Sequence, residues 1–212
     1  MQLNTYIDHT LLAADASVND IEKLCAEAIN YNFYAVCVNS SRVKSAQAFL
    51  INSEVKLAAT IGFPLGSSTK DSKITEARNA IEDGADEIDM VLNIGYLKDG
   101  NHALVQDEIS AVKKVIGNKT LKVILETGYL SDELIEKACE LSMKANADFV
   151  KTSTGFGSRG ASLEDIHIMK NVVGEKLKIK ASGGIKNAET AKRFIAAGVH
   201  RIGTSSGIRI MT

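Results

Sequence analysis

The chain has 212 residues, of which 45% are hydrophobic and 24% are charged, and its formal net charge is −1. This composition is enough for one sizeable core and excludes a disordered chain. Charges of both signs are mixed, so no basic run indicates a nucleic-acid partner, and no apolar stretch approaches the roughly 20 residues that span a membrane.

Short apolar runs and amphipathic runs alternate along the whole chain. The apolar runs predict strands and the amphipathic runs predict helices. In chain order, the predicted strands are residues 5–9, 35–39, 56–62, 87–93, 121–127, 149–153, 178–182 and 201–205. The helices predicted between them are residues 18–31, 41–51, 70–83, 102–116, 131–145, 162–173 and 187–197. Helix start signals are present at Ser17, Ser131 and Ser162, and helix stop signals at Gly84, Gly117 and Gly198.

Eight strands that alternate with helices predict a parallel sheet with helical crossovers. The count of eight fits a closed (β/α)8 TIM barrel that the chain forms as a single domain, residues 1–212. An open doubly wound sheet is the alternative. It is less well supported, because no GxGxxG motif follows the first strand and the turns rich in small residues come late in the chain, where barrels often bind phosphate.

The cysteines and histidines show no metal-binding pattern. Cys25, Cys37 and Cys139 form no CxxC motif, and the four histidines are scattered. The first ten residues lack the basic and apolar regions of an export signal. An odd number of cysteines without such a signal suits the reducing cytoplasm, so we expect a cytoplasmic protein with no metal site.

Alternation along the predicted strands assigns one set of side chains to the barrel interior. Helix-facing positions should be apolar, so the positions between them point inward. The inward set is Asp8, Cys37, Glu87, Asp89, Val91, Asn93, Lys122, Ile124, Glu126, Lys151 and Lys180. Barrel interiors are usually filled by Val, Ile and Leu. So many interior charges indicate a functional site, although a neutralised ion network joining Lys122 to Glu126, Asp89 and Asp8 is a structural alternative.

Lys151 and Lys180 lie in similar contexts. Each ends a short apolar run, FVK or KIK, and each precedes a turn of small residues, TSTG or ASGG. Two ammonium groups that face one cavity repel each other, and the loss of one proton relieves the repulsion. A neutral lysine is a nucleophile that forms a Schiff base with a carbonyl compound. A single lysine of this kind is more often a surface residue at a sheet edge, but the repeated context favours a reactive pair.

Turns of small residues follow the last two predicted strands. The sequence SGGI occupies residues 182–185, and GTSSG occupies residues 203–207. Glycine lets backbone amides approach an anion closely, while Ser205 and Ser206 offer hydroxyls and the cap of a short final helix. The two turns, together with Gly155 after the sixth strand, therefore predict a phosphate site.

The chain resembles the deoxyribose-phosphate aldolases. The matching runs cover all eight predicted strands and are YIDHTLL, AVCVNSSRV, ATIGFPLGSSTK, ADEIDMVLNIG, LKVILETG, FVKTSTGFG, KIKASGGI and RIGTSSG. KTSTGF together with KASGGI is far more specific than a single motif. The resemblance implies a class I aldolase that reversibly cleaves 2-deoxy-D-ribose 5-phosphate to acetaldehyde and D-glyceraldehyde 3-phosphate during deoxyribonucleotide breakdown.

The resemblance also implies residue roles. Lys151 would be the Schiff-base nucleophile, Lys180 the lysine that tunes it and shares in proton transfer, and Asp89 the proton-transfer carboxylate. Lys122 would support Asp89. The phosphate would lie at Gly155, Gly184, Ile185, Ser205 and Ser206.

Phe156 stands where some members of the family carry a lysine, which leaves Arg159 as an additional candidate for phosphate binding. The resemblance further implies no metal and no other cofactor, a sugar phosphate as the small-molecule partner, and a homodimer or larger homo-oligomer.

Other functions are compatible with the sequence. One is another Schiff-base lyase or transaldolase that acts on a longer sugar phosphate. A second is a barrel isomerase or synthase whose lysines only bind a carboxylate or phosphate. A third is a non-catalytic relative that binds phosphosugars, against which the presence of Lys151, Lys180 and Asp89 argues.

Overall fold

The computed structural model describes residues 2–212, and within them eight parallel strands form a closed barrel in sequence order. The strands are β1 (Ile7–Leu11), β2 (Ala35–Asn39), β3 (Lys56–Ile61), β4 (Glu87–Val91), β5 (Thr120–Ile124), β6 (Phe149–Lys151), β7 (Lys178–Ser182) and β8 (Arg201–Thr204). β8 pairs in parallel with β1, which closes the barrel. The predicted (β/α)8 barrel is confirmed, and the open sheet is excluded.

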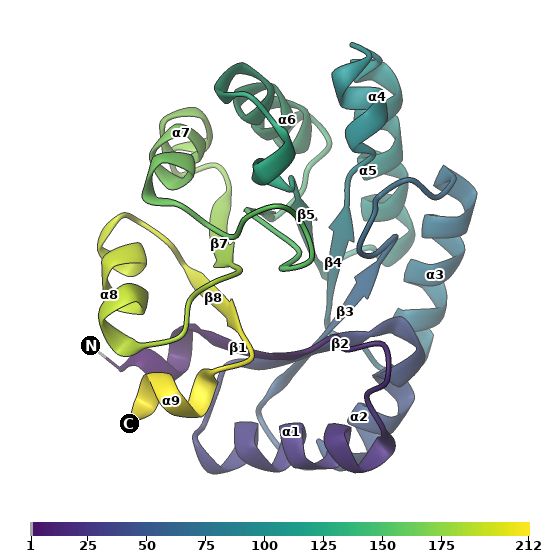
Figure 1. Ribbon diagram of the computed structural model, residues 1–212. Helices are drawn as coiled ribbons and strands as arrows, with labels where there is room; N and C mark the ends of the chain where they lie inside the picture. Colours follow the sequence, from purple (N-terminus) through teal and green to yellow (C-terminus); the bar gives the residue numbers. More distant parts are fainter. Residues whose placement is uncertain (1) are drawn as a thin grey trace.

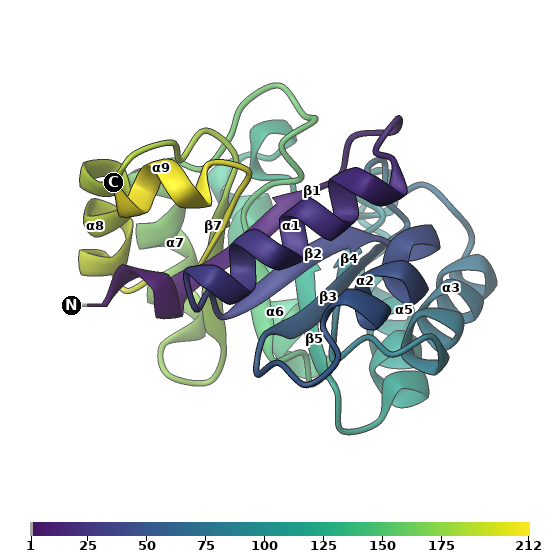
Figure 2. The same ribbon diagram turned by 90° about the horizontal axis from the view of Figure 1, so that it is seen from below.

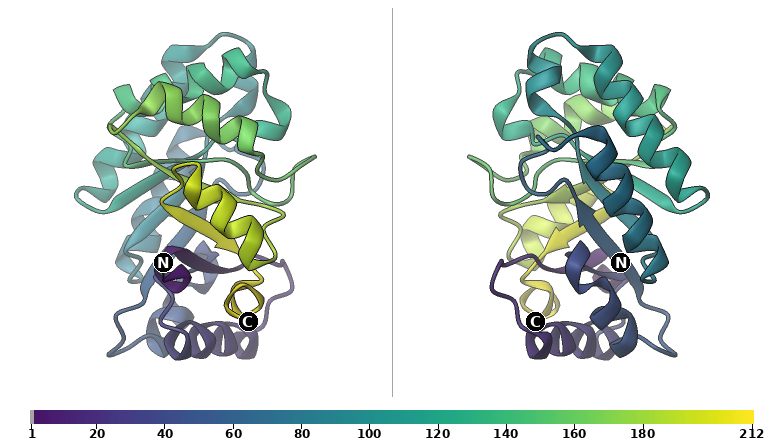
Figure 3. Two further views of the ribbon diagram at one scale, coloured as in Figure 1. Left: turned by 90° about the vertical axis from the view of Figure 1, so that its left-hand side faces the viewer. Right: turned by 90° about the vertical axis from the view of Figure 1, so that its right-hand side faces the viewer.

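Helices surround the strands (Figure 1). They are α1 (Val18–Asn30), α2 (Val43–Phe49), α3 (Lys70–Glu82), α4 (Ile94–Lys98), α5 (His102–Ile116), α6 (Asp132–Lys144), α7 (Leu163–Val173), α8 (Ala188–Ala196) and α9 (Gly207–Met211), with 3-10 turns η1 (Leu3–Tyr6), η2 (Ser40–Arg42) and η3 (Thr127–Tyr129). Seen from below, α1 and α2 cover β1 and β2 (Figure 2). In the side views, α9 and the N-terminal turn lie on the same side of the barrel (Figure 3). None of the helices within residues 2–212 combines the length and apolar character that crossing a bilayer requires.

The helix start signals behave as the sequence predicts. Ser17, Ser131 and Ser162 are N-caps whose side chains accept a hydrogen bond from the backbone three residues later. Such a bond satisfies one of the free N–H groups in the first turn of a helix. Local sequence therefore fixes where these helices begin.

The apolar core lies between the strands and the helices. The strand positions predicted to face the helices are buried in it, and they include Ile7, Val36, Val38, Ile88, Met90, Leu121, Val123, Val150 and Ile179. The intervening positions face the barrel interior, where most of the predicted charges lie. The alternation of apolar and polar residues along each strand thus decides which side chains meet inside.

Several strands end before their predicted last residue, and in β4 and β5 this changes the direction of a side chain that was predicted to point inward. β4 ends at Val91, and Asn93 caps α4 by accepting a hydrogen bond from the N–H of Tyr96 at 3.1 Å. β5 ends at Ile124, and Glu126 has left-handed backbone dihedral angles, φ 56° and ψ 59°. Side chains alternate only within a strand, and both strands end before Asn93 and Glu126. The predicted inward direction of these two side chains was therefore wrong.

A buried lysine outside the barrel interior was not anticipated from the sequence. Lys73, on α3, is completely buried, and its Nζ donates to the carbonyls of Gly66 and Val91 and to Oε2 of Glu108, each at 2.8 Å. All three ammonium protons thus have an acceptor. Lys73 ties the loop after β3 to the end of β4 and to α5.

We expect Lys73→Met to lower the free energy of unfolding by about 3–5 kcal/mol, because the buried carboxylate of Glu108 loses its partner. Denaturant unfolding followed by circular dichroism measures this. The matched control is Lys70→Met on the same helix, since Lys70 pairs with Asp107 at 2.7 Å in an exposed position. That variant should change stability little. Similar losses in the two variants would contradict the prediction.

Candidate active site

The interior charges converge because their strands are neighbours in register. Asp89 on β4 is the Cα partner of Lys122 on β5, and Lys151 on β6 is the Cα partner of Lys180 on β7. Residues paired in this way on one face of a sheet lie close enough to interact. The register therefore places two lysines side by side and a carboxylate beside a third lysine.

Asp89 is the centre of the cluster. Its Oδ1 lies 2.7 Å from Nζ of Lys122, and its Oδ2 lies 2.8 Å from Nζ of Lys151 and 2.9 Å from Nζ of Lys180. Burial alone would raise the pKa of Asp89, but the three ammonium groups hold that pKa well below its ordinary value. Asp89 is therefore an ionised carboxylate that joins all three lysines.

A second carboxylate holds Lys180 from the opposite side. Nζ of Lys180 lies 2.5 Å from Oδ2 of Asp8, whose Oδ1 accepts from Arg201 at 2.7 Å. Burial favours the neutral form of Lys180, but Asp8 and Asp89 together raise its pKa above the ordinary value. Lys180 and Arg201 outweigh the effect of burial and hold the pKa of Asp8 below its ordinary value. Lys180 is thus a fixed cation.

Glu87 completes the network by contacting Lys122 at 2.5 Å and Arg201 at 3.4 Å. Within residues 2–212, the connected network contains four cationic side chains and three carboxylates; its members are Lys122, Lys151, Lys180, Arg201, Asp8, Glu87 and Asp89. Lys151 and Lys180 share one carboxylate oxygen, so their nitrogens lie within about 6 Å of each other, a range in which like charges disfavour ionisation. The network therefore holds one more cationic side chain than carboxylates.

The predicted ion network is correct in part. The contact between Lys122 and Asp89 is present, but Lys122 pairs with Glu87 and not with Glu126, whose carboxylate instead accepts hydrogen bonds from Thr154. Asp8 pairs with Lys180 and Arg201 and has no salt bridge to Lys122. These partners differ because the backbone turns at Glu126 and because Arg201 enters the interior.

Arg201 was missed by the sequence analysis, although a signal was present. Ile202 faces the helices, so alternation along β8 places Arg201 inward. Cys37 lies inside as predicted, with its Sγ 4.0 Å from Oδ2 of Asp89. Burial raises the pKa of this thiol above the ordinary value.

A cavity of about 540 Å3 opens at the carboxyl ends of the strands. Lys151 lines it, whereas Lys122, Lys180 and Asp89 lie behind Lys151 and do not line it. The residues predicted to bind phosphate all line the same cavity: Gly155, Gly184, Ile185, Ser205 and Ser206. The amino group that can react and the small turns thus share one space.

The turn after β7 presents backbone to this cavity. Gly184 has a φ of 82°, and a Cβ added to it would meet no atom within 4 Å. A side chain is disfavoured there by the backbone conformation and not by crowding. Gly184 therefore brings backbone without a side chain to the cavity wall.

Three details of the phosphate end differ from expectation. Ser206 is the residue before α9, but its side chain makes no capping hydrogen bond. Arg159 is held by Asp165, with distances of 2.5 and 2.9 Å to the two carboxylate oxygens, and it does not line the cavity. Lys186 does line it, directly after the GGI turn, and the sequence analysis overlooked this cation.

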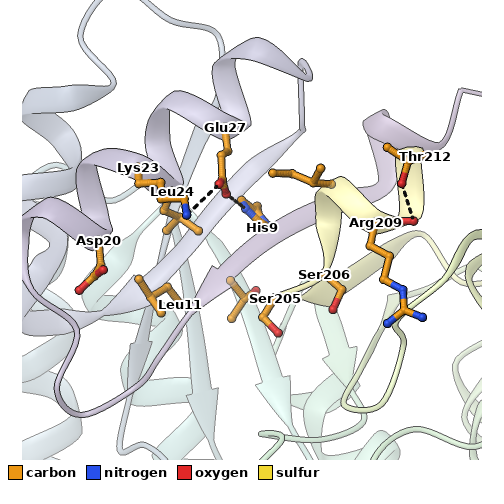
Figure 4. A pocket seen from close by; sticks show the side chains of 12 residues that line it. His9, Leu11, Asp20, Lys23, Leu24, Glu27, Ser205, Ser206, Arg209 and Thr212 are labelled. Carbon is orange, nitrogen blue, oxygen red and sulfur yellow. Dashed lines mark hydrogen bonds and ion pairs between the residues drawn. The ribbon is translucent and has the colours of Figure 1, made fainter.

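A second cavity, of about 610 Å3, adjoins the first and shares Ser205 and Ser206 with it (Figure 4). It lies beside α1 and α9, and Lys151 does not line it. Its wall includes His9 and Glu27, whose side chains pair with each other at 2.7 Å. The reactive lysine therefore belongs to the first cavity and not to the second.

The side chains that commonly bind metal ions can also be compared with the geometry of a metal site. Among the described residues, no group of three or more His, Cys, Asp or Glu side chains is arranged to hold a metal ion. The interior carboxylates instead contact lysine and arginine.

A family model described as DeoC/LacD family aldolase matches residues 3–211. Among curated relatives, the deoxyribose-phosphate aldolase of Mycoplasmopsis pulmonis is 53% identical over 211 residues, covering 100% of this chain and 96% of that protein. The deoxyribose-phosphate aldolase of Thermococcus gammatolerans is 54% identical over 215 residues, with the same two coverages.

Solved structures agree with this match. A putative deoxyribose-phosphate aldolase from Coccidioides immitis superposes with a TM-score of 0.97 at 40% identity, covering 99% of this chain and 84% of the other. The deoxyribose phosphate aldolase of Aeropyrum pernix, described as a tetramer, gives a TM-score of 0.90 at 31% identity and covers 99% and 89% of the two chains.

Proposed function

This chain belongs to the DeoC/LacD family of aldolases, and we propose that it reversibly cleaves 2-deoxy-D-ribose 5-phosphate into acetaldehyde and D-glyceraldehyde 3-phosphate. The enzyme is a lyase of the class I aldolase type and acts in deoxyribonucleotide breakdown. The observation that carries this function is Lys151, which is the residue where the buried ion network meets the cavity lined by small turns.

The reaction begins at Lys151. Its neutral amine adds to the aldehyde carbon of the open-chain sugar, and loss of water gives an iminium ion. Asp89, acting with Lys180 and an intervening water, takes the proton from the hydroxyl on the far side of the bond that breaks. The carbon–carbon bond electrons move to the iminium, which releases glyceraldehyde 3-phosphate and leaves an enamine on Lys151. Protonation of the enamine and hydrolysis then release acetaldehyde and restore the amine.

The surrounding charges suit these steps. Lys180 remains a cation beside the reacting amine, and Lys122 and Lys180 keep Asp89 ionised. Because the iminium is the electron sink, the chemistry needs no metal and no other cofactor. The phosphate lies over Gly155, Gly184, Ile185, Ser205 and Ser206, where amides, hydroxyls and the nearby Lys186 favour an anion.

We also infer a cytoplasmic homo-oligomer, either a dimer or a larger assembly. Support comes from the relative from Aeropyrum pernix, which is described as a tetramer. Sedimentation of the purified protein measures the number of subunits.

Borohydride trapping tests the proposed function. Incubation with deoxyribose 5-phosphate or acetaldehyde and then borohydride should add a reduced adduct to Lys151 alone, because Lys151 is the interior lysine that lines the cavity. Peptide mass mapping locates the adduct. Modification of Lys180 with Lys151 intact would reverse the assigned roles. Trapping by a longer sugar phosphate but not by acetaldehyde would indicate a transaldolase.

A carboxylate at position 205 tests the phosphate site. Ser205→Glu should raise KM for deoxyribose 5-phosphate by at least about tenfold, because it replaces a hydroxyl at the cavity wall with a negative charge. Steady-state kinetics with unphosphorylated deoxyribose should change much less, and borohydride trapping of acetaldehyde should persist. Equal losses with both sugars would mean that the phosphate binds elsewhere.

A further inference from the structure

Glu126 is a buried carboxylate that the proposed mechanism does not use. It lies two residues after the end of β5 and is 2% exposed. Its backbone lies in the left-handed region, with φ 56° and ψ 59°, which side chains other than glycine seldom adopt. Strained backbone of this kind concentrates at functional sites. The strain directs the side chain away from Lys122 and toward the loop after β6.

The carboxylate of Glu126 accepts hydrogen bonds from that loop. The N–H of Thr154 lies 3.3 Å from both carboxylate oxygens, and the hydroxyl of Thr154 donates to Oε2. The N–H of Phe156 donates in turn to Oγ1 of Thr154 at 3.0 Å. Because Oγ1 accepts from Phe156, its own proton is free to point at Glu126. The result is a chain of hydrogen bonds from Glu126 through Thr154 to Phe156.

The loop is packed directly against this carboxylate. A Cβ added to Gly157 would lie 2.9 Å from Cδ and Oε1 of Glu126, so any side chain at position 157 would displace this carboxylate. A second anchor lies further along, where Ser158 donates to the carbonyl of Gly128 at 3.0 Å. The segment 154–158 therefore follows the surface of the loop after β5.

The anchored segment forms one wall of the catalytic cavity. Thr154, Gly155 and Phe156 all line the cavity beside Lys151. The backbone at Lys151 is fixed independently of Glu126's side chain, since the carbonyl of Lys151 accepts from the N–H of Leu125 at 2.9 Å. The side chain of Glu126 thus controls the position of the wall and not that of the nucleophile.

We propose that Glu126 is a positioning residue that fixes Thr154, Gly155 and Phe156 at the wall against which the sugar phosphate binds. Its carboxylate accepts several hydrogen bonds and donates none, which matches the ionised form. Burial raises the pKa of Glu126 above the ordinary value, and the hydrogen bonds from Thr154 oppose that rise. The identity of the ligand rests on the proposed function, whereas the position of the wall does not.

Hydrogen–deuterium exchange tests the wall without any substrate. Glu126→Met removes both acceptors at nearly constant size, and Thr154→Val removes the linking hydroxyl. Both variants should exchange the amide of Phe156 about tenfold faster or more, because the hydrogen-bond chain is broken. Ser158→Ala is the matched control, as it removes only the second anchor and should leave this amide unchanged. Unchanged exchange in Glu126→Met, or equal acceleration in Ser158→Ala, would overturn the proposal.

Kinetics separate positioning from chemistry. In Glu126→Met, KM for deoxyribose 5-phosphate should rise about tenfold while kcat stays within about threefold, and Glu126→Gln, which keeps one acceptor oxygen, should recover most of the loss. The KM of the double variant Glu126→Met/Thr154→Val should be no higher than that of the poorer single variant, because both substitutions remove the same interaction.

A fall in kcat with unchanged KM would overturn the proposal and assign Glu126 to the chemistry at Lys151. If the unmodified enzyme does not cleave deoxyribose 5-phosphate, the proposed function fails, and the exchange result still decides the role of Glu126.

Discussion

Replacing Lys151 with methionine should lower kcat/KM for deoxyribose 5-phosphate by at least about 10⁴-fold, because no other amine that lines the cavity is held against Asp89 to form the Schiff base. The fold should persist. Removing Lys151 leaves three cations facing three carboxylates in the described network, and every carboxylate keeps a partner. Steady-state kinetics and the circular dichroism spectrum measure the two results.

Lys151→Arg is the control that separates charge from reactivity. Arginine keeps a cation beside Asp89, but it remains protonated and does not form a Schiff base. It should be as inactive as the methionine variant, and borohydride should trap no adduct in either protein. Activity within tenfold of the unmodified enzyme in Lys151→Arg would show that position 151 acts only as a charge.

The substitution Lys180→Leu should lower kcat/KM for deoxyribose 5-phosphate near pH 7 by about 10²–10³-fold. Two unit charges about 4–6 Å apart repel by about 3–4 kcal/mol at an effective dielectric near 20, as an upper limit, and 1.4 kcal/mol corresponds to a factor of ten. Without Lys180 this repulsion vanishes, so a larger fraction of Lys151 is protonated and unreactive at neutral pH. Activity should therefore recover as the pH rises, and the alkaline shift of the pH–rate profile measures the effect.

Lys180→Arg is the matched variant, because it keeps a positive charge between Asp8 and Asp89. Its pH–rate profile should stay near that of the unmodified enzyme even if its rate falls. In Lys180→Leu, Asp8 still pairs with Arg201 and Asp89 with Lys122, so unfolding does not account for the loss. An unchanged pH–rate profile in Lys180→Leu would show that Lys180 does not tune Lys151.

The sequence was sufficient for the order of the elements and for the inward direction of most site residues. Periods of two and 3.6 residues are local properties, so strands and helices follow from short windows. Alternation placed Asp8, Asp89, Lys122, Lys151 and Lys180 in the interior, and the structure confirms those positions. Alternation failed at Glu126 because this residue has a left-handed backbone conformation, which interrupts the alternation of side chains along the strand. No pattern of residue types in the sequence predicts that turn.

By itself, then, the sequence determined the barrel, the interior lysines and the late turns of small residues. Only the tertiary structure decided which charges pair, since partners such as Asp8 and Arg201 are 193 positions apart and meet only after β8 closes on β1. Closure also decided that Lys151 faces the cavity while Lys122 and Lys180 stay behind it. The physical reason is that ion pairing and exposure depend on register and on barrel closure, which combine all eight strands, whereas periodicity depends on each strand alone.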